Sequence, residues 1–586
     1  MNEDLSSLEK ESDDAVIVKT LTQYYEYLAT IRRDFEDLWD DVITYLAYDR
    51  YNYKQDQQKG KKANTQVYDG TPVSAWNLLV NGLHGNTISQ GSPWFGLGIP
   101  ITVRTKRVSV MRKYDGMRLD EIPEVKIWLE DKQDVMYSAF QRSNFYGEAN
   151  GLIRDATSIG TATFHPREII SQNKINFDNI HPGQIYIAEN CYGAVDTVFR
   201  KFRLAAKIAA QKFDEEKFSP AMTQALKNAP YQEFDFIHAI FPRSDQEMYI
   251  DIDGQMKPKR GSNNMPWVSY YIECGNKENI LLKEGFRYNP LIVWRWSKNS
   301  DEWYGRSPAM DAIVDIMKLN VMSRSMINAG QMAVEPAYMA HEKFRNKIRL
   351  TPRGVNYYAS DNEKITPINQ GLSYPIGQDR EQDARKIIED HFHTDTFLML
   401  AKAAMEGRQL SVPQVMEMQG EKAAIMMPTV GRMIAEFLQP VVDVVDMIET
   451  EAGRMPPPPE ILLEFGGQNI EVDYVGPLAM AQKRLLKTQG IYQGIAALEP
   501  LAKVFGPEAM DAVDPTATSI EILKVSGWPA KSIRTQDQID AIRKERVDQQ
   551  NQAMQIKAAQ MMAQNVPNLS KAPEQGSPIA AMAGAQ

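Results

Sequence analysis

The sequence predicts an α+β protein that is predominantly helical and divided into several structural units. The chain has 586 residues, which is too many for one ordinary hydrophobic core. Apolar side chains recur at helical spacing along most of the chain, whereas short β-rich runs are confined to about residues 161–296. Hydrophobic residues make up 43% and charged residues 24%, as in an ordinary soluble globular protein.

The first 300 or so residues are expected to form one mixed unit. Residues 15–50 carry apolar and aromatic side chains at the spacing of an amphipathic helix. The elements expected next are a polar loop, a helix at about 72–88, an extended segment opened by residues 89–100, helices over 121–160, and the β-rich runs, interrupted by a helical insertion at 204–228. We expect Trp294, Trp296 and Trp303 to fill the core rather than to stack on nucleic-acid bases.

The middle of the chain has two long helical patterns on either side of a short excursion. The first is expected over 308–332, with Ser307 as N-cap and Pro308 in the first turn. Short strand-like pieces follow, and the second helix is expected over 379–402. This order predicts a stalk of two helices that carries a small β-containing head.

A third long helical pattern, at about 412–452, follows a short break. Kinks are expected at the three helix-breaking residues inside it, Pro428, Gly431 and Pro440. Four prolines at 456–459 end the helix, and an extended segment then leads to helical sequence from 478 to about 547. The last 40 or so residues, rich in Gln, Met and Ala, are expected to begin helical and end disordered.

Charge and cysteine content exclude several function classes. The formal net charge of −10 argues against a tight, sequence-reading DNA binder, but not against a surface past which DNA slides. The two cysteines, Cys191 and Cys274, make no disulfide framework and fit a reducing cytoplasm. His391 and His393 would point to different sides of a helix, so we do not expect them to share a metal ion.

No targeting segment or catalytic motif is expected. Residues 1–14 are acidic and lack the apolar run of a signal peptide, and no stretch has the roughly 18 apolar residues of a membrane span. The sequence lacks a G-x-x-x-x-G-K-[ST] phosphate loop, a G-x-S-x-G elbow and an H-E-x-x-H motif. We therefore expect a protein that is not an enzyme, holds no cofactor or metal ion, and does not enter a membrane.

Several short phrases form an ordered set along the chain. The two most distinctive are Trp303-Tyr304-Gly305-Arg306-Ser307-Pro308 and Asp473-Tyr474-Val475-Gly476-Pro477-Leu478-Ala479. The others are Arg32-Arg33-Asp34-Phe35-Glu36, Tyr68-Asp69-Gly70-Thr71, Ser92-Pro93-Trp94-Phe95, Asn144-Phe145-Tyr146, Ser158-Ile159-Gly160-Thr161-Ala162 and Gly527-Trp528-Pro529. In this order, over about residues 18–550, the chain resembles the head-to-tail connecting, or portal, proteins of short-tailed bacteriophages.

The resemblance implies the portal fold, with a wing, a stem, a clip and a crown. The implied parts are an acidic N-terminal arm (1–14), a wing (15–306), a first stem helix (307–332), a clip (333–378), a second stem helix (379–402), a tunnel loop (403–411), a long kinked helix (412–454), an extended return segment (455–477), a helical crown (478–550) and a partly disordered tail (551–586). Some portal proteins end in a long helical barrel, but the short, polar carboxy terminus predicts none here.

The resemblance also implies a function. Such a chain would form a dodecameric ring with a central channel at one vertex of the capsid, assembled in the host bacterial cytoplasm and retained in the virion. Its implied partners are the large terminase subunit, the major capsid and scaffolding proteins, tail adaptor or nozzle proteins, and double-stranded DNA that passes non-specifically. The alternative is another structural or assembly protein of the virion, of the capsid or scaffolding class, without a DNA channel.

Two groups of charged residues are candidate sites. Near the tunnel loop, Lys402, Glu406 and Arg408 would face the channel, where the two cations could touch the DNA backbone. Solvated charges or inter-subunit salt bridges explain those cations equally simply. In the clip, five cations could meet an acidic partner, namely the packaging motor or a tail adaptor: Lys343, Arg345, Lys347, Arg349 and Arg353. A solvated basic face, or ion pairs with Asp361 and Glu363 within the ring, remains the alternative.

Overall fold

The computed structural model describes residues 14–48, 66–91, 93–100, 122–243, 248–250, 256–258, 264–276, 278–335, 337–340, 366–367, 374–398, 412–464, 471–474, 513–525 and 536–569, with a few isolated positions between them. The chain divides into two compact units, residues 1–485 and 486–586. The first is a mixture of helices and antiparallel sheets, so the prediction of an α+β fold is confirmed.

Helices at the positions expected from the apolar spacing form the amino-terminal part. They are α2 (Asp14–Tyr45), α3 (Thr71–Thr87), α5 (Pro123–Arg142) and α6 (Phe145–Ile159). The inner side of α2 is fully buried at Leu21, Leu28 and Trp39. The last of these helices, α6, ends at Gly160, whose φ of +85° is a conformation that residues with a Cβ rarely adopt.

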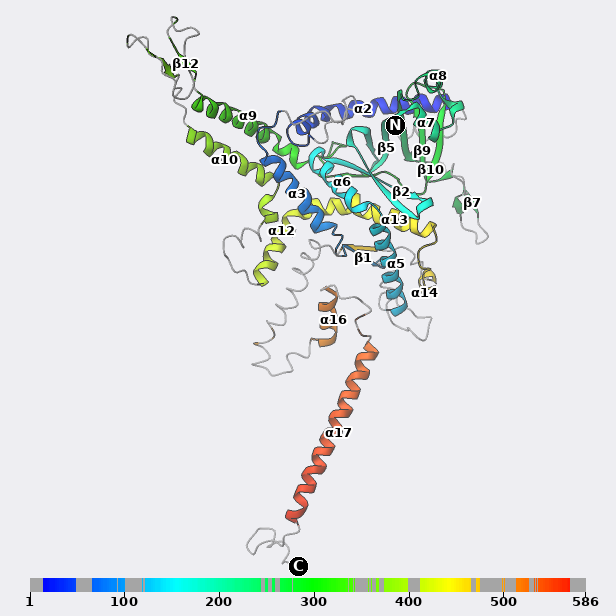
Figure 1. The fold of residues 1–586 in the computed structure, drawn as a ribbon. Helices are drawn as coiled ribbons and strands as arrows, with labels where there is room; N and C mark the ends of the chain where they lie inside the picture. Colours follow the sequence, from blue (N-terminus) through cyan, green and yellow to red (C-terminus); the bar gives the residue numbers. More distant parts are fainter. Residues whose placement is uncertain are drawn as a thin grey trace, which may run out of the picture. The chain divides into compact units, whose positions relative to one another are not determined.

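Two antiparallel sheets form the body of this unit (Figure 1). The larger has the order β10-β9-β6-β5-β4, and the smaller the order β11-β2-β3. Their strands are β2 (Thr161–Ile169), β3 (Lys174–Ile180), β4 (Ile185–Glu189), β5 (Val195–Ala205), β6 (Glu233–Pro242), β9 (Trp267–Glu273), β10 (Ile280–Phe286) and β11 (Ile292–Arg295). A small separate pair joins β7 (Met248–Ile250) to β8 (Met256–Pro258).

The larger sheet is covered on both faces. Because side chains alternate along a strand, Phe199 and Phe202 of β5 point to opposite faces. The amino-terminal half of α2 packs on the Phe199 face, and Figure 1 shows the helix lying along the sheet. The expected helical insertion forms α7 (Ala206–Lys212) and α8 (Pro220–Asn228), which pack on the Phe202 face.

The main core contains many aromatic side chains. Trp294 of β11 is fully buried, and its ring lies 5.9 Å from that of Phe437 on the long helix. Trp296 is 7% exposed, and Trp303 packs against the same core. The prediction that these three tryptophans serve the core is confirmed.

The long third helix changes character near its middle. It consists of α12 (Val412–Met433), a π-helical turn η10 (Ile434–Leu438) and α13 (Gln439–Glu451), and Figure 1 shows α12 and α13 running in different directions. Pro440 has no N–H and its ring crowds the carbonyl of Glu436, so the wider π turn accommodates it. The α12 helix continues through Pro428 and Gly431, where kinks were also expected.

The segment after the long helix returns to the body. Gly453, with φ of +69°, follows α13, and α14 (Glu460–Glu464) comes after the four prolines. β14 (Glu471–Tyr474) then pairs antiparallel with β1 (Phe95–Gly98), which places Tyr474 opposite Phe95. This pairing joins two of the phrases that carry the family resemblance.

The second unit contains α16 (Pro515–Val525) and α17 (Gln536–Leu569). The latter has 34 residues and is therefore about 50 Å long. It extends well beyond residue 550, where the crown was expected to end. Residues 551–569 are thus helical, which confirms the expectation that the last 40 or so residues begin helical. The prediction of no helical barrel stays untested.

Candidate functional site

A pair of helices, α9 (Pro308–Val334) and α10 (Tyr374–His391), occupies the position of the expected stalk. They pack side by side, and Figure 1 shows β12 near their far end. The expected N-cap is confirmed, because Ser307 Oγ accepts a hydrogen bond from Met310 N at 3.1 Å. The other helix begins earlier than the expected residue 379 and ends at His391, because His393 adopts a φ of +52°.

The loop at residues 66–70 forms hydrogen bonds to both α9 and α10. Asp69 accepts hydrogen bonds from Arg385 of α10 at 2.8 and 3.0 Å and from Ser323 of α9 at 3.4 Å. Burial opposes ionisation of Asp69, but hydrogen bonds from Thr71 and Arg385 outweigh it, so the pKa of this carboxyl lies below its usual value. Asn320 of α9 adds a hydrogen bond to the carbonyl of Gln66 at 2.6 Å. The loop therefore holds the helix pair against the body.

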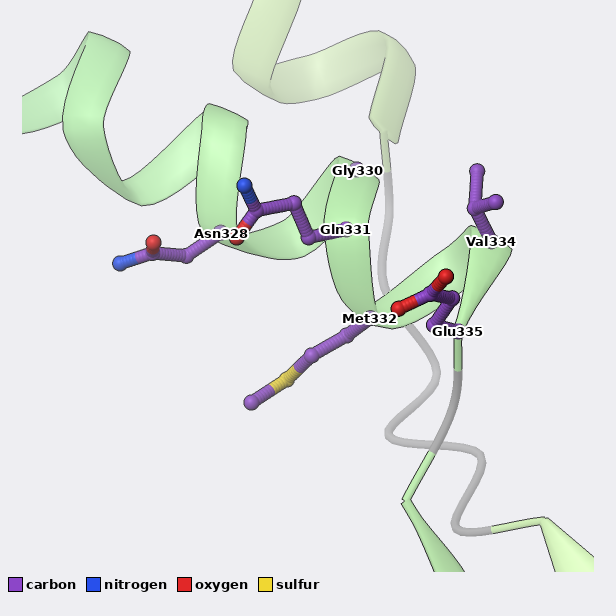
Figure 2. A pocket seen from close by; sticks show the side chains of 6 residues that line it. All are labelled: Asn328, Gly330, Gln331, Met332, Val334 and Glu335. Atoms are coloured by element: carbon purple, nitrogen blue, oxygen red, sulfur yellow. The ribbon is translucent and has the colours of Figure 1, made fainter. Parts of the chain in front are cut away.

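A short strand pair lies beyond the helices. β12 (Tyr338–Met339) and β13 (Thr366–Pro367) are antiparallel, with Tyr338 opposite Pro367. Because these two strands pair, the chain that leaves α9 and the chain that leads to α10 lie next to each other, as expected of a small head carried by a stalk of two helices. Figure 2 shows the open hollow at the end of α9, which is lined by Asn328, Gly330, Gln331, Met332, Val334 and Glu335.

The eight charged residues singled out in the sequence lie outside the described residues. They are Lys402, Glu406 and Arg408 near the tunnel loop, and Lys343, Arg345, Lys347, Arg349 and Arg353 in the clip. Near the clip residues in sequence, the structure describes the β12–β13 pair; near the tunnel-loop residues, it describes Phe397. Phe397 packs against α3 so closely that a side chain on Gly82 would overlap its ring. The roles of the eight residues stay predictions.

The start of α9 is hydrogen-bonded to the body where residues 158–161 contact residues 305–307, two of the segments that carry the family resemblance. Gly305 N donates to Thr161 Oγ1 at 2.8 Å, and Ser307 Oγ donates to the carbonyl of Ser158 at 2.7 Å. The backbones of Gly160 and Gly305 touch, so that a Cβ on Gly160 would overlap the Gly305 carbonyl. The helix pair therefore cannot move at its base independently of the sheets.

A buried charge network ties the same region to the long helix. Arg295 of β11 has a side chain only 2% exposed, and its guanidinium contacts Glu189 and Glu436, the latter at 2.7 Å. Glu436 lies in the π turn and also pairs with Arg432 at 3.0 Å. Lys298 forms a second ion pair with Glu189, with its Nζ 2.7 Å from Glu189 Oε2. The two sheets and the π turn thus share one set of charges, of which Arg295 and Glu189 are the most deeply buried.

Comparison with known proteins decides the family. Residues 18–533 match the family described as bacteriophage head to tail connecting protein. The chain belongs to this family. It is 28% identical over 550 residues to a probable portal protein of Bordetella phage BPP-1, with 92% of each chain covered. It is also 28% identical over 574 residues to the portal protein of Salmonella phage epsilon15, with 96% of each chain covered.

Family membership confirms the resemblance to head-to-tail connecting proteins and the prediction of a non-enzymatic protein. Head-to-tail connecting proteins are structural components of the phage virion. Within the described residues, no three His, Cys, Asp or Glu side chains are grouped to hold a metal ion. None of the helices in the described part of the chain is long and apolar enough to cross a membrane.

Sequence reasoning missed the Arg295 network. The run Leu291–Trp296 was interpreted only as a strand, although a charged residue inside an apolar run is itself a signal of a buried ion pair. Its partner Glu436 is far away in sequence, and nothing local indicates the pairing.

Proposed function

We propose that twelve copies of this head-to-tail connecting protein form a ring at one capsid vertex, through which double-stranded DNA passes during packaging and ejection. The observation that carries the proposal is the α9–α10 pair, which is fixed to the body at its base and bears the β12–β13 excursion at its far end. Copies of such a stalk around a common axis would enclose a channel.

The outer side of α9 supports assembly. Val314 is 67% exposed, Val321 64% and Met332 50%, and their spacing places all three on one side of the helix. A helix that is apolar on both its inner and outer sides is normally covered on both. In a ring, the neighbouring copy would cover this outer side.

The charge of the chain suits a conduit. A net charge of −10 on each copy would repel phosphates from most of the channel wall, so that DNA could move in either direction without being held. Glu406 and Arg408 would lie in the tunnel loop, and Lys402 just before it. The basic clip residues Lys343, Arg345, Lys347, Arg349 and Arg353 would meet the large terminase subunit or a tail adaptor. The wing and crown would contact capsid and scaffolding proteins.

The experiment is a measurement of assembly by sedimentation velocity and native mass spectrometry. Val321→Glu should prevent ring formation, because it puts a charge where the neighbouring copy packs. Ile170→Glu is the matched control, since Ile170 is 80% exposed at the turn between β2 and β3. Rings in the wild type and the control, but not in Val321→Glu, support the proposal. Rings in all three would show that this side of α9 is not the contact. Absence of any ring, also after capsid and scaffolding proteins are added, would favour a virion protein without a channel.

A further inference from the structure

One face of the larger sheet carries a row of polar side chains at a place where a core face is normally apolar. Arg200 of β5 is paired with His238 of β6, and His238 with Tyr271 of β9. The rings of His238 and Tyr271 are stacked, with centroids 3.8 Å apart. Lys212 of α7 places its Nζ 4.0 Å from the centroid of the Tyr271 ring. We call these four residues the donor row.

The donor row has more donors than acceptors. Arg200 donates from Nε to Gln184 Oε1 at 2.9 Å, and within the described part of the chain its terminal nitrogens have no hydrogen-bond partner. The same holds for the Lys212 ammonium and for the hydroxyl of Tyr271, a residue only 7% exposed. Tyr271 is buried and Arg200 is half-buried, whereas Lys212 is exposed, so these donors lie where the protein meets solvent. An acceptor from outside the chain would satisfy them.

The smaller sheet adds two side chains to this place. His165 and Arg167 lie two positions apart on β2, and therefore on the same face. Arg167 pairs with Asp178. His165 is 6% exposed, and among the described residues its ring nitrogens have no hydrogen-bond partner.

The cations of the two sheets repel one another. Burial lowers the pKa of Lys212 to about 8, and Arg167 and Arg200 contribute to the shift, while Glu284 opposes it. Burial also lowers the pKa of His165 to about 3, again with contributions from Arg167, Arg200 and Lys212. The carboxylates among the described residues that offset the charges of Arg200 and Lys212 are Asp178 and Glu284, and Asp178 is already paired with Arg167. The Arg200 guanidinium is thus a half-buried cation that lies 5.1 Å from the centroid of the Phe202 ring and is hydrogen-bonded to no carboxylate in the described part of the chain.

We propose that the donor row, together with His165, binds a phosphate group. A tetrahedral phosphate presents oxygens in several directions, and would accept from the terminal nitrogens of Arg200, the Lys212 ammonium, the Tyr271 hydroxyl and a ring N–H of His165. A carboxylate has two oxygens in one plane and would satisfy fewer of these donors. The phosphate could be free in solution or part of a nucleic-acid backbone, since both present the same oxygens.

The test is calorimetric titration of the assembled full-length protein with inorganic phosphate at constant ionic strength and pH 7. Wild-type protein should bind phosphate, and affinity should fall at least tenfold in Arg200→Gln and several-fold in Lys212→Gln. Lys207→Gln is the matched control, because Lys207 is an exposed cation on the same helix whose Nζ lies over the ring of Tyr231 instead. The control should bind as the wild type does.

The result that would overturn the proposal is wild-type protein that binds no phosphate, or binding that is unchanged in both variants. If Arg200→Gln does not fold, Lys212→Gln decides alone, because Lys212 is an exposed residue at the end of the short helix α7. A second titration uses a short DNA duplex. Duplex binding that Lys212→Gln weakens would identify a nucleic-acid backbone as the source of the phosphate, whereas binding of inorganic phosphate alone would identify the free ion.

Discussion

Arg295 contacts Glu436 both through its backbone nitrogen and through its side chain. The backbone nitrogen of Arg295 donates to Glu436 Oε2 at 2.9 Å, and its guanidinium donates to Oε1 at 2.7 Å. The first bond ties the end of β11 to the π turn, and the second neutralises a buried cation. The bend of the long helix is therefore fixed by the sheet and not by Pro440 alone.

Removal of the Glu436 charge should destabilise the body strongly. We expect Glu436→Gln to lower the free energy of unfolding by about 3 kcal/mol, because a buried cation loses a partner. Glu451→Gln is the control: Glu451 pairs with Arg287, but the two side chains are 47% and 59% exposed, so less than about 1 kcal/mol should be lost. Chemical denaturation measures both, and equal losses would show that the Arg295 network contributes little.

The contact between Gly160 and Gly305 should tolerate no side chain. Gly160→Ala would place a Cβ against the Gly305 carbonyl at a φ of +85°, so we expect loss of soluble, folded protein. Gly85→Ala, at an exposed helical position with nothing within 4 Å, should be neutral or gain up to about 1 kcal/mol. Soluble yield and thermal unfolding distinguish the two variants. A folded Gly160→Ala protein of normal stability would contradict the close approach.

The cap of α9 should contribute measurably to stability. Ser307→Ala removes the acceptor for Met310 N and the donor to the Ser158 carbonyl, and should cost about 1–2 kcal/mol. Ser325→Ala, on the exposed side of the same helix, should change stability by less than about 0.5 kcal/mol. The difference is measured by urea denaturation. If both variants change the free energy of unfolding by similar small amounts, the start of α9 is held by the backbone contacts alone.

Stability should fall in mild acid because two histidines are buried in the neutral form. Burial is the main cause that lowers the pKa of His165 to about 3, and it holds the pKa of His238 well below 6.5. Both protonate near pH 6.5 in the unfolded chain, so neither costs stability above that pH. Below it, each lowers the free energy of unfolding until the pH reaches its pKa in the folded protein.

Each of these histidines accounts for at most about 1.4 kcal/mol per pH unit below 6.5. Urea denaturation between pH 7 and pH 5 measures the slope, which should be shallower in His165→Gln than in the wild type. His391→Gln, at a partly exposed residue 3.6 Å from Asp315, is the control. An unchanged slope in His165→Gln would mean that this histidine does not resist protonation.

Much of the fold could be predicted from local patterns. Apolar spacing predicted α2, α3, α5, α6 and α9, because each of these helices buries one side against the body. The cap at Ser307 could be predicted since it depends only on neighbouring residues. The π turn could not, because Pro440 shows where a hydrogen bond is missing but not how the helix adapts. The end of α10 was also missed, since His393 adopts a positive φ without being glycine.

The family phrases indicated the candidate region without revealing its contacts. Ser158–Thr161 and Gly305–Ser307 are separate in sequence, yet they touch because both lie where the smaller sheet meets the base of α9. Arg295 and Glu436 meet only through tertiary packing, which no local pattern encodes. The charged residues predicted for the channel and the clip fall outside the described residues, so their roles stay predictions.

The proposed ring can be observed by negative-stain electron microscopy of the purified protein, with class averages viewed along the particle axis. We predict twelve-fold rings with an open centre wide enough for a DNA duplex. Capsid and scaffolding proteins are added in a second preparation, in case assembly needs them. Monomers or irregular oligomers in both preparations would contradict the claim that this chain forms the DNA conduit.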